Sequence, residues 1–188
     1  MILNRILSNA ESNEVLGQVQ SLATASRFHA RGIVQSHDAI EQWHIEVDYS
    51  AQQWFAVNDL GQVHEFRDGV TFHQGEPVAH PTEISSELVG PLIAAFPDRL
   101  QWWEGRSHGF RPVLIERVGN QSLLLTFEHG ADQSMRATLV VDTQLGLVTR
   151  VMHFNSPYIM FLDVELDRGI ERLTPESFPA LEVMYPQY

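Results

Sequence analysis

The sequence predicts an α+β domain in which one long antiparallel meander curves into an incomplete β-barrel, with helices packed on its concave face. Apolar and polar residues alternate through most of the chain, which is typical of half-buried strands. Short turn motifs separate these runs, and helical spacing is confined to the N-terminus and one mid-chain stretch. We expect a single domain over residues 1–188, because an apolar content of 44% supports one sizeable core.

The N-terminal part of the chain predicts an amphipathic helix. Ser8 and Glu11 match a capping box, and apolar residues such as Val15 and Val19 follow at helical spacing up to about Ala25. A helix of this length is marginal alone in water, so its apolar face is expected to pack on the sheet.

Strand periodicity then begins at Arg27 and runs to Phe72. Asp68-Gly69 is a strong signal for a two-residue hairpin turn, because such a turn needs positive φ angles. Looser turns are expected near His37 and around residues 58–61. The expected strands cover residues 28–34, 43–49, 52–57, 62–67 and 70–72. Their order predicts a meander.

The strand pattern stops between residues 77 and 110, where prolines punctuate the chain. Residues Ile84 to Phe96 predict a helix that is kinked or interrupted at Pro91. We interpret the stretch as an insertion between two halves of the sheet. Its apolar side chains, together with Trp102 and Trp103, are expected to cover the concave face.

Strands resume after this insertion. They are expected over residues 112–118 and 122–128, and three more fill residues 136–168, for a total of about ten. The turn over residues 142–146 joins an aspartate, which can accept hydrogen bonds from its own backbone, to a closing glycine. In the last strand Met160 and Leu162 fall on one face, whereas Phe161 falls on the other. The proline-broken tail after Arg168 predicts irregular chain.

Composition excludes several classes of function. A formal charge of −12 and a pI near 5.0 argue against a basic face for nucleic acid or an anionic membrane. The absence of cysteine excludes disulfides, zinc-thiolate sites and lipid attachment through cysteine. No run is apolar enough to span a bilayer or to form a secretory signal. As written, the chain is expected to be cytoplasmic, or extracytoplasmic if a leader has been removed.

Two stretches resemble a known family. Val141–Arg150 is similar to the strand-turn-strand pattern D-x-x-x-G-L-x-x-R of the bacterial lipoprotein-carrier superfamily, which has the LolA-like fold. The closing strand Phe161–Leu166, followed by Phe178, is a second correspondence, and in layout the resemblance extends back to about Val15. It implies a half-barrel plugged by helices, with acyl chains or hydrophobic peptide segments held on the concave side. It implies no catalytic residue, and the lack of an export signal and a lipid-attachment cysteine departs from members that shuttle lipid.

Signals for catalysis and metal binding are weak. The nine histidines include no helical His-x-x-x-His pair and no metalloprotease motif, so we expect neither a metal site nor a cofactor. Asp163 and Glu165 share a strand face, but alternation alone produces such pairs. Ser107-His108 lies in a glycine-flanked loop without the strand-turn-helix elbow of serine nucleophiles. An enzyme built on either pair is a third hypothesis, and we expect no enzymatic activity.

The leading hypothesis is a protein that binds a hydrophobic ligand, acyl or lipid-like, on the concave side of the sheet. If aromatic side chains and the mid-chain helix leave the barrel partly empty, the remaining space is an apolar pocket. If they fill it, the alternative is a protein-interaction or regulatory sensor domain that docks a protein partner. The residues expected to line the pocket are Trp43, Trp54, Phe72, Leu92, Phe96 and Phe161.

Overall fold

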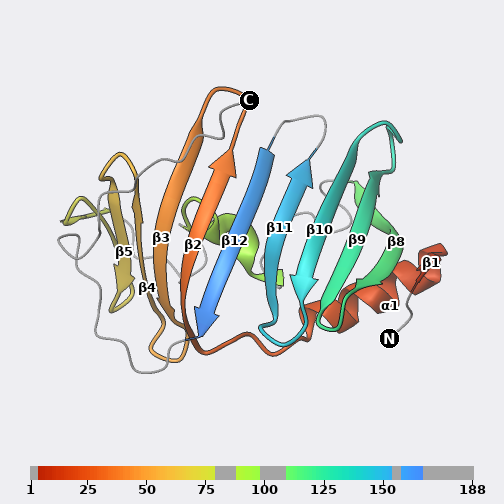
Figure 1. The fold of residues 1–188 in the computed structure, drawn as a ribbon, viewed down its shortest axis with the longest axis horizontal. Coiled ribbons are helices and arrows are strands. Elements are labelled where there is room, and N and C mark those ends of the chain that lie inside the picture. The colour runs from red at the N-terminus through yellow and green to blue at the C-terminus, as the bar shows by residue number, and fades with distance from the viewer. Residues whose placement is uncertain (1–3, 79–87, 98–108, 154–157, 167–188) are drawn as a thin grey trace.

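The computed structural model describes residues 4–78, 88–97, 109–153 and 158–166. These residues form a 12-stranded antiparallel sheet and two helices, α1 (Asn9–Gln20) and α2 (Leu92–Ala95) (Figure 1). The strands are β1 (Arg5–Ile6), β2 (Arg27–Gln35), β3 (Ile40–Asp48), β4 (Gln53–Asn58), β5 (Val63–Arg67), β6 (Val70–His73), β7 (Glu76–Pro77), β8 (Phe110–Val118), β9 (Ser122–His129), β10 (Arg136–Asp142), β11 (Leu147–His153) and β12 (Tyr158–Leu166).

Two meanders make up the sheet, which confirms the predicted antiparallel topology with two strands more than expected. One meander runs from β2 to β7 and the other from β8 to β12, and the pairing of β12 with β2 joins them. In that pairing Met160 lies opposite Val34, and Leu162 lies opposite Gly32. The sheet is open, because its edges are β1 and β7, both strands of two residues. Such short edges offer little backbone for pairing with another chain.

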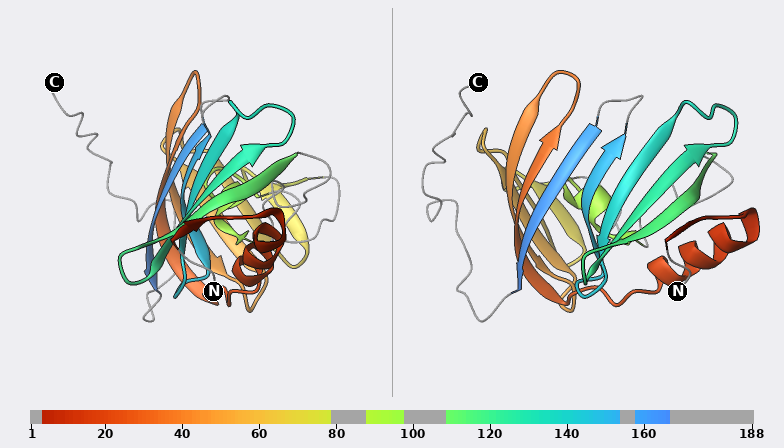
Figure 2. Two further views of the ribbon diagram at one scale, coloured as in Figure 1. Left: turned by 90° about the vertical axis from the view of Figure 1, so that its right-hand side faces the viewer. Right: turned by 45° about the vertical axis from the view of Figure 1, so that its right-hand side comes forward.

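The helices and the curvature of the sheet define two faces. We call the face that carries α1 and α2 the inner face and the opposite one the outer face. In Figure 1, α2 lies behind β2 and β12. Figure 2 shows that the sheet curls towards this side, with β4 and β5 bent round α2, so the inner face is concave. Inward-pointing residues of β2 to β5 and of β8 to β12 form one continuous hydrophobic core with both helices.

Helix α1 forms as the sequence predicts, although it ends at Gln20 rather than near Ala25. The Ser8 side chain accepts a hydrogen bond from the Glu11 backbone N–H, and the Glu11 carboxylate accepts one from the Ser8 backbone N–H. Buried Ser12 donates to the carbonyl of Pro112 over 2.7 Å and so ties the helix to β8.

Helix α2 is much shorter than the helix expected over residues 84–96. It has 4 residues, and the chain is extended at Phe96 (φ −98°, ψ 115°). Pro91 stands at its start, where the missing N–H costs no intrahelical bond. Residues 84–87 of the expected helix lie outside the described residues. No helix in the described ranges is long and apolar enough to cross a membrane.

Two predicted turns have the expected backbone. Asp68 (φ 53°) and Gly69 (φ 75°) both have positive φ, as a type I′ hairpin turn requires. Asp142 accepts hydrogen bonds from two backbone N–H groups of the next turn, and Gly146 closes that turn with φ 62°. A Cβ at Gly146 would overlap the carbonyl group of Ala23, so glycine is required there by both conformation and space.

Candidate functional site

Aromatic side chains from β3, β4 and β5 line the inner face of the sheet. Trp43 and Trp54 are each 4% exposed and belong to the hydrophobic core. Trp54 stacks on Phe66 of the next strand, with ring centroids 6.5 Å apart and planes inclined by 14°. These side chains share a face because each strand places every second residue on the same side.

Helix α2 docks on this aromatic surface through very close contacts. Gly32 of β2 leaves room for the Pro91 ring, and a Cβ there would lie 3.0 Å from the Cβ of Pro91 and closer still to its Cγ. Gly90 packs in the same way against the indole of Trp43. The Phe96 ring lies 6.5 Å from that of Phe28. At these positions the side chains of the inner face and of α2 are therefore in close contact, without an open space between them.

The structure divides the six predicted ligand-binding residues between the two faces. Trp43, Trp54, Leu92 and Phe96 are together in the core. Phe72 pairs with Glu65 in register and lies on the outer face, where the Arg67 guanidinium carbon is 4.8 Å from its ring centroid. Phe161 is also on the outer face and is 43% exposed, between two inward-pointing neighbours in β12. The alternation of β12 itself predicts this position, so Phe161 should not have been grouped with inward-facing residues.

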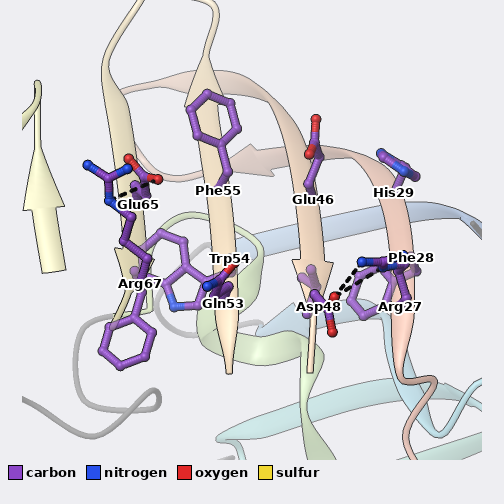
Figure 3. Close-up of a pocket in the computed structure, with 12 residues that line it drawn as sticks. Arg27, Phe28, His29, Glu46, Asp48, Gln53, Trp54, Phe55, Glu65 and Arg67 are labelled. Atoms are coloured by element: carbon purple, nitrogen blue, oxygen red, sulfur yellow. Dashed lines mark hydrogen bonds and ion pairs between the residues drawn. The ribbon is translucent and has the colours of Figure 1, made fainter. Parts of the chain in front are cut away.

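A cavity of about 190 Å³ lies on the outer face of β2, β3, β4 and β5 (Figure 3). Register places His29, Glu46, Phe55 and Glu65 side by side on these four strands. Of the predicted residues only Trp54 lines this cavity. The wall is mostly polar, and the volume is below the ~300–1,000 Å³ of sites for drug-sized ligands. The cavity suits a small polar group rather than an acyl chain.

Two ion pairs flank this cavity. A guanidinium nitrogen of Arg27 lies 2.6 Å from a carboxylate oxygen of Asp48, and Arg67 Nε lies 3.5 Å from Glu65 Oε1. The Ser50 hydroxyl, the Ala51 backbone N–H and then Arg27 donate to Asp48 and lower the pKa of its carboxyl to about 2.

The structure brings together two of the nine histidines. His64 of β5 and His73 of β6 are opposite each other in register, and their Nδ1 atoms are 3.2 Å apart. The Asp68-Gly69 turn was the signal for this pair, because a two-residue turn there places residue 64 opposite residue 73. His44 lies on the outer face, where burial, and then Arg31, lower its pKa.

The residue pairs considered for catalysis are not brought into a cleft by the described structure. Asp163 and Glu165 lie exposed on the outer face of β12, opposite Arg31 and His29 of β2. Ser107 and His108 lie outside the described residues. Within the described ranges, no group of three or more His, Asp or Glu side chains is arranged to hold a metal ion.

Comparisons with known proteins reveal similar folds at low identity. No family model and no curated protein matches this sequence. Among solved structures, MucB is 15% identical with a TM-score of 0.44; the match covers 92% of this chain but only 64% of the MucB chain. LprF from Mycobacterium bovis is 8% identical with a TM-score of 0.44, over 91% of this chain and 99% of LprF. The LolA superfamily protein NE2245 from Nitrosomonas europaea is 12% identical with a TM-score of 0.33, over 89% of this chain and 97% of NE2245. These values assign the chain to no family and transfer no function.

Proposed function

We propose that this chain is a non-enzymatic binding protein that holds a hydrophobic ligand, acyl or lipid-like, on the inner face of the sheet. The ligand takes the place that α2 occupies in the structure. The sequence resemblance to the lipoprotein-carrier superfamily implies that acyl chains are held on the concave side, and the displacement of α2 is our addition to it. The observation that carries the proposal is the nature of α2: a helix of 4 residues that covers an aromatic surface and is held there by apolar contacts.

Helix α2 is bound to that surface only weakly, so a ligand can displace it. A single turn of helix has no stability of its own, and no side-chain hydrogen bond caps this one. Its large buried side chains are Leu92 and Phe96, and burying each of them stabilises the docked state by roughly 1.5–3 kcal/mol. An acyl chain gains about 0.8 kcal/mol per buried CH₂. About four to eight methylene groups therefore offset the loss of both side chains.

The experiment is native mass spectrometry of gently purified protein, followed by organic extraction and by titration with a saturated fatty acid. We expect a mass adduct that is lost on denaturation, or saturable one-to-one binding of the fatty acid. Gly32→Ala pushes Pro91 away from the sheet and should tighten fatty-acid binding several-fold. Ile93→Asp is the matched control, because Ile93 lies in the same helix but is 54% exposed. A clean apo mass together with no fatty-acid binding by wild type and by Gly32→Ala contradicts the proposal.

An exposed apolar strip on the outer face favours a second candidate, the docking of a protein partner. Phe161 of β12 lies opposite Ile33 of β2 in register, and Met152 of β11 lies opposite Ile159 of β12. Phe161, Ile33 and Met152 are all exposed. Phe161→Ser should weaken a protein complex and leave fatty-acid binding unchanged, whereas Gly32→Ala should tighten fatty-acid binding and leave the protein complex unchanged.

A further inference from the structure

The hairpin β5–β6 holds two imidazoles in a fixed relation. The Asp68-Gly69 turn sets the register, so that His64 and His73 face each other across neighbouring strands. Their ring centroids are 4.4 Å apart and their planes are inclined by 49°. Cross-strand neighbours in a short hairpin have little freedom to separate. The register therefore brings the two rings together, and their Nδ1 atoms lie 3.2 Å apart, at hydrogen-bonding distance.

The surroundings favour neutral imidazole at His64 and leave His73 accessible. The His64 ring is half-buried and lies 5.8 Å from the ring of Trp43. Burial, and then the charge of His73, lower the pKa of His64. His73 is exposed to solvent. Neutral imidazole is the form that binds metal ions, and an exposed partner gives an ion a path to the site.

We propose that His64 and His73 together bind one divalent transition-metal ion through their Nδ1 atoms. Two nitrogens that each lie about 2.0–2.1 Å from a tetrahedral ion are themselves about 3.3–3.4 Å apart, and the observed distance is 3.2 Å. The hairpin thus presents two nitrogen ligands at the separation that one ion requires. This proposal departs from the expectation, drawn from the sequence, that the chain holds no metal.

The donor set decides which ions fit. Two imidazole nitrogens suit Zn²⁺, Ni²⁺ and Cu²⁺, with Cu²⁺ the tightest in the usual order, whereas Ca²⁺ and Mg²⁺ prefer oxygen. In the described part of the chain no third His, Asp or Glu completes a set, so water molecules fill the remaining positions. A site with two protein ligands is open, and its affinity is lower than that of closed structural zinc sites.

An ion at this site would join β5 to β6 near the end of the sheet, where the final strand has only 2 residues. Binding to the folded hairpin stabilises the protein by RT ln(1 + [L]/Kd), so the melting temperature should rise with ion concentration. Trp43 lies beside His64, so a bound Cu²⁺ or Ni²⁺ should also quench its fluorescence. Both effects depend on the same two imidazoles.

The test is calorimetric titration of the full, tag-free chain with Zn²⁺ at about pH 7.5, with an amide NMR spectrum to locate the ion. We expect one site, with shifts at His64 and His73. His73→Gln should lower the affinity about tenfold or more, and His64→Gln should do the same. His37→Gln is the matched control: His37 is an exposed histidine beside Asp38, and its loss should leave the Zn²⁺ affinity of the pair unchanged within about twofold.

Three results would overturn the proposal. The first is a wild-type affinity no higher than that of His73→Gln. The second is an equal loss of affinity in His37→Gln, which indicates scattered surface binding. The third is a set of shifted amides that excludes β5 and β6. Because His73 is exposed, its replacement should not unfold the hairpin, and the amide spectrum of each variant checks this directly.

Discussion

Gly32→Ala tests how α2 is held on the inner face. A Cβ at position 32 would lie 3.0 Å from the Cβ of Pro91, closer still to its Cγ, and 3.5 Å from Cδ1 of Leu162. Pro91 must therefore move, and α2 moves with it. Overpacking of a core typically costs about 1–3 kcal/mol. Complete undocking would also expose Leu92 and Phe96, at roughly 1.5–3 kcal/mol each, so about 3–6 kcal/mol is the upper bound.

The assay is urea unfolding followed by far-UV circular dichroism, with Gly17→Ala as the matched control. Gly17 lies in α1, and a Cβ there meets nothing within 4 Å, so this variant should gain about 0.5–1 kcal/mol. Both variants change the unfolded chain in the same way. The difference between them contains the contacts of the new Cβ at position 32 and the helix propensity gained at position 17, so a Pro91→Ala background is needed to assign the loss to Pro91. Pro91→Ala should restore part of the stability lost in Gly32→Ala, because it removes the ring that the new Cβ meets.

A Gly32→Ala variant as stable as the Gly17→Ala control would refute this reasoning. It would mean that α2 can shift away from the sheet at no cost. The buried side chains of the helix would then contribute nothing to the free energy of unfolding. A Gly32→Ala variant that loses stability but gains no affinity for fatty acid would separate the packing from the proposed function. The packing of α2 on the sheet would then be correctly described, and the proposal that a ligand replaces α2 would be wrong.

Three further predictions concern stability. Ser8→Ala removes the capping box of α1 and should cost about 1 kcal/mol in urea unfolding. Gly146→Ala introduces a Cβ against the backbone of Ala23 at φ 62° and should lower stability by more than about 1 kcal/mol, whereas Gly119→Ala, which meets no neighbour, should show only the smaller cost of its positive φ. The pKa of Asp48 is about 2 in the folded protein against an ordinary 3.8. Its contribution to the free energy of unfolding is therefore complete above about pH 4 and is lost as the pH falls towards 2. Asp48→Asn should make that free energy depend less on pH below about pH 4.

Local chemistry made much of the fold predictable. The capping box of α1, the positive φ at Gly69 and the turn closed by Gly146 all depend on residues within a few positions of one another. Period-two alternation likewise assigned Met160 to the buried face and Phe161 to the exposed one. These features follow from short-range sterics and hydrogen bonds, which a single sequence expresses directly.

The pairing of β12 with β2 could not be predicted in the same way. Alternation tells which face of a strand is buried but not which strand lies beside it. Met160 and Val34 meet across more than a hundred residues of sequence, and their register depends on packing across the whole core. The length of α2 was mispredicted for a related reason. Apolar spacing over residues 84–96 favours helix, but Phe96 is extended and reaches the rings of Phe28 and Tyr49.

The same alternation also explains why the metal proposal and the outer cavity can be tested apart. His64 and Glu65 are adjacent in β5, yet His64 faces Trp43 on the inner side and Glu65 lines the outer cavity. Glu65→Gln removes one negative charge next to the pair in sequence, but the charge is on the opposite face of the sheet. If the imidazoles bind Zn²⁺ directly, Glu65→Gln should change the Kd by less than about twofold, because Glu65 lies on the opposite face and its charge is partly offset by Arg67, whose Nε is 3.5 Å from Glu65 Oε1. His64→Gln should lower the affinity about tenfold or more in the same titration. Equal losses in the two variants would mean that the negative field of the protein, rather than two nitrogen ligands, attracts the ion.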